Sequence, residues 1–321
     1  MGLIAGMAPG WRLTLLGLLA LLSCAAFMTL NVQGNWAFVF VYRGTRLAAM
    51  LLVAVAIGLS TVLFQTITHN RILTPSLMGF DVLYVLVQSL ALFLWGLGSL
   101  TALPLPLRFG MEVGALVLLV LLIFRLLFSG SVRSLHLMIL LGILFGMLFR
   151  ELSGLALRVL DPSEFSIQQG RSFASFSRIN VSLLGVAAGA VALAGMLLWR
   201  VRSYLDVLAL GRDIAINLGV HYRRLLLMLM TVIAVLVSAS TALVGPTLFF
   251  GLVVANLAYW LMGTQQHRWT LPASVLAGVV CLVGGQVLLD HLFLSTLPLA
   301  MVIELAGGLL FIALLMRGVK T

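Results

Sequence analysis

Residues 47–67, LAAMLLVAVAIGLSTVLFQTI, lead through Thr68 into residues 69–81, HNRILTPSLMGFD. The first stretch is apolar for long enough to cross the roughly 30 Å hydrocarbon core of a bilayer, which takes about 20 residues of α-helix. The second stretch gathers Asn, Arg, Thr, Pro, Gly and Asp in a short interval, a composition typical of turns. Together they predict a membrane-spanning helix that ends in a polar turn, and they leave open whether that turn is also a site.

The same succession of long apolar runs and short polar breaks continues along the whole chain. Of the 321 residues, 62% are hydrophobic and only 9% are charged, which is too little charge to coat a soluble fold. A β-barrel would show short segments of alternating polarity instead. The sequence therefore predicts an all-α polytopic membrane protein with about ten transmembrane helices in a single transmembrane domain, residues 1–321. The predicted spans lie near residues 12–30, 47–67, 77–97, 111–128, 135–150, 181–199, 223–243, 246–262, 271–290 and 297–316.

The arginines predict the orientation of the chain. The formal net charge is +10, and Lys320 is the only lysine. Single arginines between apolar spans indicate topology and partner docking rather than a nucleic-acid surface. An even number of spans puts both termini on one side, and the loops on that side hold more of the arginines. The positive-inside rule then predicts cytoplasmic termini for a multi-pass protein in contact with membrane lipid.

No catalytic, metal-binding or nucleotide-binding pattern is visible. The histidines are scattered without metal-ligand spacing, and no P-loop is present. Cys24 and Cys281 lie in different apolar runs and are predicted to be packing residues. Residues 21–24, LLSC, resemble a lipoprotein signal, but apolar sequence continues to Leu30 and favours a first transmembrane helix. We therefore expect no enzyme activity, no cofactor and no metal site.

Three carboxylates inside or beside the spans keep a different kind of transporter open. Glu304 lies within the last predicted span, Asp81 near the start of the third and Asp290 at the end of the ninth. Ionisable residues within a bilayer often mark substrate or proton pathways. An ion-coupled secondary transporter therefore stays an alternative, with Glu304 as its strongest support.

Two loops are longer than a turn needs. Residues 151–180, which contain Asp161-Pro162 and several Phe and Ser residues, predict a short surface helix. Residues 206–220 predict a pair of short helices broken at Gly211, with Gly219 as a C-terminal cap. Their apolar face, which would suit lipid or a partner protein, is formed by Leu208, Leu210, Ile214 and Leu218. The chain looks like a transport protein, has no P-loop of its own and carries such an apolar face. We therefore predict that a separate cytoplasmic motor drives it.

Four motifs in order resemble the iron–siderophore permeases of ABC importers, the family that includes the vitamin B12 importer permease. RGTRL at 43–47 resembles R-x-P-R, and NRILTPSLMG at 70–79 resembles N-P-L-A-x-P-x-x-L-G. LGRDIAINLGV at 210–220 resembles L-G-x-x-x-A-x-x-L-G-V, and GPTLFFGLVV at 245–254 resembles G-P-x-x-F-x-G-L. The resemblance covers roughly residues 40–316 and implies the B12-importer-type permease fold.

The chain also departs from the family pattern. Arg71 and Thr45 replace prolines, and Ala255-Asn256 replaces Pro-His. These variants resemble the branch that handles catecholate-type siderophores, in which two different permease chains often pair. The resemblance implies an inner-membrane permease for ferric siderophore that works with a cytoplasmic ABC ATPase dimer, a second permease chain, paralogous or identical, and a periplasmic siderophore-binding protein. Import of another metal chelate, such as haem or cobalamin, is the alternative within the family.

The resemblance implies three sets of site residues. Arg43 and Arg46 would dock acidic residues of the binding protein, which suits the bidentate geometry of guanidinium groups. Asn70 and Ile72 would form the cytoplasmic gate, with Ser131 and Ser134 as a second layer. The coupling segment, residues 206–220, would seat in a groove of the ATPase. Its expected contact residues are Asp206, Leu208, Leu210, Gly211, Ala215, Leu218 and Gly219.

Overall fold

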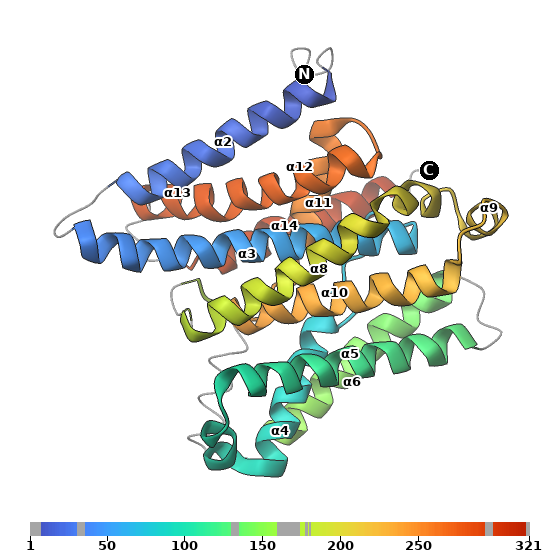
Figure 1. Cartoon of the computed structure of the whole chain (residues 1–321), viewed down its shortest axis with the longest axis horizontal. Helices are drawn as coiled ribbons and strands as arrows, with labels where there is room; N and C mark the ends of the chain where they lie inside the picture. The colour runs from blue at the N-terminus through green and yellow to red at the C-terminus, as the bar shows by residue number, and fades with distance from the viewer. Residues whose placement is uncertain are drawn as a thin grey trace.

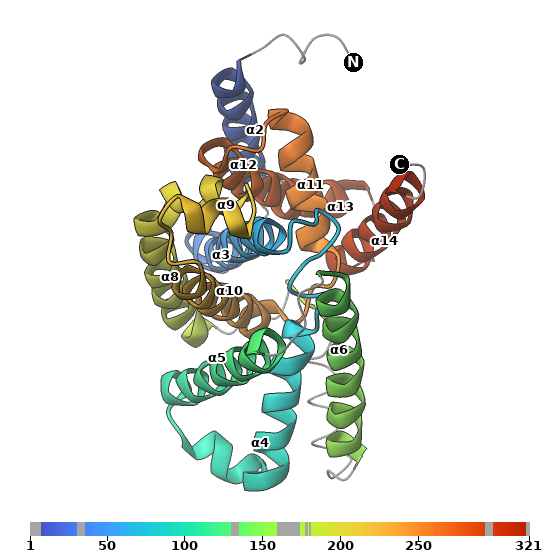
Figure 2. The same ribbon diagram turned by 90° about the vertical axis from the view of Figure 1, so that its right-hand side faces the viewer.

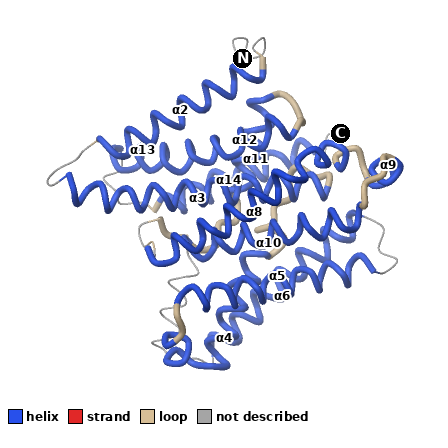
Figure 3. The backbone as a smooth tube through the Cα atoms, viewed as in Figure 1, coloured by secondary structure: helices blue, strands red, loops and turns tan. Residues whose placement is uncertain are grey.

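The computed structural model describes residues 8–30, 36–129, 135–158, 174–176, 179, 181–292 and 298–318. All regular structure within these ranges is helical, and Figure 3 shows the helices joined by loops. Residues 267–292 form one uninterrupted helical run that includes a π-helical turn. The elements are α2 (Pro9–Thr29), α3 (Trp36–Thr68), α4 (Phe80–Ala102), α5 (Leu105–Ser129), α6 (Leu135–Arg158), α8 (Val181–Leu208), α9 (Arg212–Asn217), α10 (Tyr222–Val244), α11 (Phe250–Met262), α12 (His267–Val279), η1 (Val280–Gly284), α13 (Gly285–Leu292) and α14 (Leu299–Gly318).

Each predicted span corresponds to a helix of the described chain, and the all-α polytopic prediction is confirmed. Six helices are long and apolar enough to cross a membrane, and three shorter apolar helices accompany them. Several predicted boundaries were wrong. α3 begins at Trp36, α6 runs on to Arg158 and α11 begins only at Phe250. The shift in α6 arises because charged residues such as Arg150 and Glu151 continue a helix where it is exposed.

The centre of the bundle is formed by α3 and α10, which pack against each other with α8 and α12 around them (Figures 1 and 2). Met50 of α3 and Leu229 and Ile233 of α10 are fully buried. At Gly278 of α12 a Cβ atom would meet the Cβ of Ala54 at 3.1 Å, so small residues set the close approach of α3 and α12. A second group, α4, α5 and α6, packs below this centre in both views.

Two ends of the bundle can be distinguished from its contacts. Nη1 of Arg12 donates to the carbonyl oxygens of Leu261 and Met262, both at 3.2 Å, which joins the start of α2 to the end of α11. The following turn leads to His267, which contacts Asp206 near α9. These segments form the α9 end of the bundle, on the right of Figure 1. The start of α3 lies at the opposite end.

Candidate functional site

The polar stretch after α3 is held as a built turn. Oδ1 of Asn70 accepts a hydrogen bond from the backbone N–H of Ile72 at 2.9 Å. The carbonyl oxygen of Arg71 accepts from Nε2 of Gln65 at 2.7 Å and from Nδ2 of Asn256 at 3.2 Å. These contacts fix the backbone of both predicted gate residues, Asn70 and Ile72, at the α9 end.

Arg71, which stands where the family pattern has proline, has a clear structural role. Its guanidinium lies over the ring of Tyr259, 4.9 Å from the centroid, in a cation–π contact. Its backbone carbonyl accepts the two hydrogen bonds described above, from Gln65 of α3 and Asn256 of α11. The side chain and backbone of Arg71 therefore fasten the turn to α11, whereas a proline would keep the carbonyl contacts and lose the cation–π contact with Tyr259.

The stretch ends where two backbones nearly touch. Gly79 has φ 85°, a left-handed conformation that favours glycine. A Cβ atom at Gly79 would lie 2.5 Å from the Cα of Gly146 on α6. Gly79 thus allows the start of α4 to cross α6 closely at Gly146, where a Cβ atom would lie 3.3 Å from the Cα of Gly79.

The three carboxylates that supported the alternative of an ion-coupled transporter are hydrogen-bonded within the protein, Glu304 first among them. Oε1 of Glu304 accepts from the backbone N–H of Leu248 at 2.7 Å, and Oε2 accepts from that of Phe249 at 3.3 Å. A negative charge at this position complements the exposed N–H groups and the dipole at the start of α11. Glu304 therefore caps a neighbouring helix.

Asp81 and Asp290 are also bonded within the protein. Asp81 is 2% exposed, and its carboxylate accepts from the hydroxyl of Thr241 and the backbone N–H of Thr247, both at 3.3 Å. Oδ1 of Asp290 accepts from Nε2 of Gln286 at 2.8 Å. Within the described residues, no group of three or more His, Cys, Asp or Glu side chains could hold a metal ion.

Arg43 and Arg46 lie at the end opposite α9. Nη1 of Arg43 donates to the carbonyl oxygens of Phe27 at 2.9 Å and Leu30 at 2.6 Å, at the end of α2. Nε of Arg46 donates to the carbonyl oxygen of Phe176 at 3.2 Å. Both arginines are half-buried and bind neighbouring loops, so any docking role would be added to a structural one.

The coupling segment divides into buried and exposed residues. Leu210 and Leu218 are 56% and 61% exposed, and Ile214 of α9 is 48% exposed. Leu208 and Ala215 are fully buried, so the prediction that Leu208 belongs to the exposed apolar face was wrong. The reason is that α8 runs on to Leu208 and turns this side chain into the core.

Two glycines frame α9. Gly211, which precedes the helix, has φ 104°. Gly219 follows it with φ 82°, and its N–H donates to Ile216 O at 2.9 Å while Val220 N–H donates to Ala215 O at 3.0 Å. This pair of bonds is the Schellman motif, and it confirms Gly219 as the C-terminal cap.

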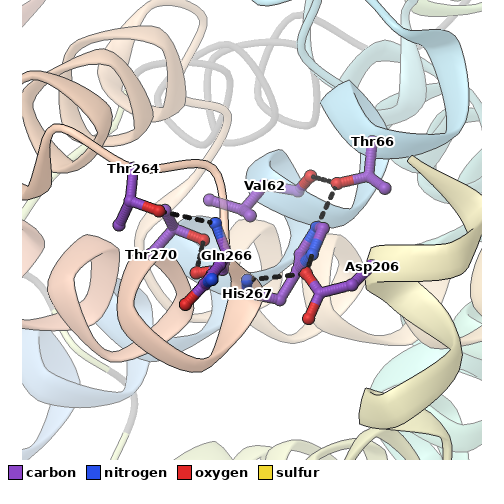
Figure 4. A network of polar contacts seen from close by, with 7 residues as sticks. All are labelled: Val62, Thr66, Asp206, Thr264, Gln266, His267 and Thr270. Atoms are coloured by element: carbon purple, nitrogen blue, oxygen red, sulfur yellow. Dashed lines mark hydrogen bonds and ion pairs between the residues drawn. The ribbon is translucent and has the colours of Figure 1, made fainter. Parts of the chain in front are cut away.

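Asp206 contacts a residue that the sequence reasoning passed over. Its Oδ1 accepts from the backbone N–H of His267 at 3.0 Å and from ring Nδ1 at 2.7 Å. Figure 4 shows His267 between Asp206 and Thr66, whose hydroxyl lies 2.7 Å from ring Nε2. The sequence carries no signal for this cluster, because its members are far apart along the chain.

Two predicted positions are not placed. Ser131 and Ser134, the second layer of the gate, lie outside the described residues. The surface helix predicted for residues 151–180 also falls mostly outside them, and its first residues belong to α6.

Comparisons with known proteins agree with this architecture. Residues 13–317 match the FecCD transport family. The petrobactin import system permease protein YclO of Bacillus subtilis is 39% identical over 97% of this chain and 98% of its own. The ferric enterobactin transport system permease protein FepD of Escherichia coli is 31% identical over 86% of this chain and 80% of its own.

A solved structure shares the fold. A metal-chelate type ABC transporter in an inward-facing conformation superposes with a TM-score of 0.79 and 22% identity, over 97% of this chain and 100% of that one. The named relatives are permease proteins of import systems, and the permease subunit of an ABC transporter is not itself the ATPase. The match over nearly the whole length, on an all-helical bundle with membrane-spanning helices, shows that this chain belongs to the FecCD transport family.

Proposed function

We propose that the chain is the permease subunit of an ABC importer that carries ferric siderophore across the bacterial plasma membrane, with petrobactin as the first candidate. The observation that carries the proposal is the 39% identity to a petrobactin permease over almost the full length of both proteins. The α9 end would face the cytoplasm, with both termini. The partners would be an ATPase dimer, a second permease chain and a siderophore-binding protein outside.

The exposed part of the coupling segment supports a mechanism. Leu210, Ile214 and Leu218 would seat in grooves of the ATPase, because exposed apolar side chains on a short helix suit such docking. Closure of the ATPase dimer on ATP would displace α9 as a unit. The substrate would pass between two permease chains, in a cavity that binds it weakly, since tight binding would oppose release after each cycle.

Uptake measurements test the proposal. Proteoliposomes that contain the permease chains and the ATPase, with ATP trapped at the ATPase side, should take up labelled ferric petrobactin delivered by its binding protein. An ATP-independent uptake that follows an ion gradient would contradict the proposal. Competition by haem or cobalamin, without competition by siderophores, would instead identify a different chelate.

Substitutions at Glu304 separate this function from ion-coupled transport. Glu304→Gln keeps one acceptor oxygen for the backbone of Leu248 or Phe249, so we expect uptake close to that of the parent. Glu304→Leu leaves both N–H groups unpaired, at a cost of about 1–3 kcal/mol each, and should lower the folded yield. If Glu304 carried protons, the Gln variant would fold normally and lose uptake.

Charge reversal at the outer arginines tests the docking role. Arg43→Glu with Arg46→Glu should weaken binding of the siderophore-binding protein by about tenfold or more at low salt, and less at high salt, because paired charges steer and hold the complex. Arg150→Glu with Arg158→Glu, two exposed reversals on α6 with the same total change in charge, are the matched control. Binding that is unchanged in the double variant of Arg43 and Arg46, measured with folded protein, would remove both arginines from the docking site.

A further inference from the structure

The carboxylate of Asp206 is bonded to the permease itself. It accepts two hydrogen bonds from His267, the first residue of α12, as Figure 4 shows. The side chain of Asp206 is 52% exposed, whereas that of His267 is 5% exposed. A bond from a carboxylate to a buried ring is shorter and stronger than one between neutral groups. The end of α8 is therefore tied firmly to the start of α12.

The connection continues from His267 into α3. Ring Nε2 of His267 lies 2.7 Å from the hydroxyl of Thr66, and this hydroxyl donates its proton to Val62 O at 2.8 Å. The Asp206–His267–Thr66 chain thus links three helices and ends on the backbone of α3.

A second contact joins the same two helix ends directly. Nε2 of His69, just after α3, donates to the carbonyl oxygen of Leu208 at 3.2 Å. His69 has φ 49°, a left-handed conformation that costs energy for a residue with a Cβ atom. The last turn of α8 therefore holds the end of α3 in two ways: through the side chains of Asp206, His267 and Thr66, and through the backbone carbonyl of Leu208.

These contacts lie between the coupling segment and the predicted gate. Leu208 is followed by Leu210 and α9, and His69 is followed by Asn70 and Ile72. Along the chain, however, the two segments are separated by α4, α5, α6 and α8. Movement at α9 therefore has a shorter route to the gate through contacts between helices than along the chain, and these hydrogen bonds lie on that route.

We propose that Asp206, His267 and Thr66, together with the contact between His69 and Leu208, form the mechanical link that carries displacement of the coupling segment to the gate. The inference rests on the proposed function and assigns these residues a positioning role within it. Asp206 acts inside the permease, and only the apolar residues beyond it meet the ATPase.

Site-specific labelling tests the link in the assembled complex. Single cysteines are placed at Leu218→Cys or Ile72→Cys after Cys24 and Cys281 are changed to alanine, and alkylation rates are compared with ADP and with a non-hydrolysable ATP analogue. In the parent, both positions should respond to the nucleotide. In Thr66→Val, the response at Leu218→Cys should remain, and that at Ile72→Cys should fall by about fivefold or more, the lower range for coupled sites. Uptake per ATP hydrolysed should fall in parallel.

Conservative and matched variants distinguish a link from a structural brace. Thr66→Ser and Asp206→Asn keep the bonding oxygen atoms in place. Each of these variants should therefore retain the response of Ile72→Cys to the nucleotide. Thr264→Val is the matched control, because it makes the same chemical change in the nearby turn. The Thr264 hydroxyl accepts from Gln266 N–H at 3.3 Å and does not bond to Asp206, His267 or Thr66. Thr264→Val should leave the response intact. Asp206→Ala, at an exposed side chain, repeats the test if Thr66→Val folds poorly.

The possible failures can be told apart. If Ile72→Cys still responds fully to the nucleotide in both Thr66→Val and Asp206→Ala, the link is overturned and the proposed function stands. If Leu218→Cys does not respond in the parent complex, the ATPase does not act at the coupling segment. In that case the proposed coupling through α9 fails, and the link fails with it, whereas the uptake measurement decides the proposed function separately.

Discussion

Replacement of Gly79 by alanine is expected to destabilise the folded permease by about 3 kcal/mol and to remove most of it from detergent extracts. The left-handed φ of 85° penalises any Cβ atom, and this one would lie 2.5 Å from the Cα of Gly146. Because the obstructing atom belongs to the backbone, α4 and α6 must separate to make room. Fluorescence-detected size-exclusion chromatography measures the fraction of protein that stays monodisperse after heating.

Gly154→Ala is the matched control for this substitution. Gly154 lies on α6 like Gly146, and no atom of the described chain would lie within 4 Å of its Cβ beyond its own helix and neighbours. Alanine also favours the helix there. Equal survival of the two variants would show that α4 and α6 do not depend on this close approach.

Replacement of Leu210 and Leu218 together by aspartate is expected to lower uptake by at least about tenfold, because buried apolar anchors at an interface each contribute about 2 kcal/mol or more. The folded yield should be unchanged, since these side chains are 56% and 61% exposed. The ATPase should no longer copurify with the permease. Both readouts follow from one loss, that of the apolar contact with the ATPase groove.

Tyr204→Asp provides the control for a charge added at this end. Tyr204 is 48% exposed on α8, before the coupling segment. The Tyr204→Asp variant should still copurify with the ATPase and should take up substrate like the parent. A double Leu variant that still copurifies with the ATPase and transports normally would place the motor on another surface.

Local patterns predicted much of this fold. The long apolar runs predicted the helices because a spanning segment has few alternatives in lipid. Gly211 and Gly219 were recognised around α9 because a positive φ and a C-terminal cap depend only on neighbouring residues. Their environment, in contrast, needed the structure. The predicted apolar face could not show that Leu208 turns inward while Leu210 and Leu218 stay exposed.

Long-range polar contacts were outside the reach of the sequence. Glu304 looked like an unpartnered charge within the last span because its partners are backbone N–H groups, which no sequence pattern marks. His267 looked isolated because Asp206 and Thr66 come from other helices. In both cases the missing information was which ends of helices the packing brings together.

The two caps on α11 have a consequence for how the protein is made. With 13 residues, α11 is about 20 Å long and too short to carry both of its ends into water across the bilayer. Its last two carbonyls are bound by Arg12 from the first described helix, and the N–H groups of Leu248 and Phe249, just before its start, by Glu304 from the last one. During synthesis α11 thus enters the membrane with one end still unsatisfied, and it becomes a complete element only when α14 has followed it. Truncation before Glu304 would leave the N–H groups of Leu248 and Phe249 without this partner and α11 without its second anchor.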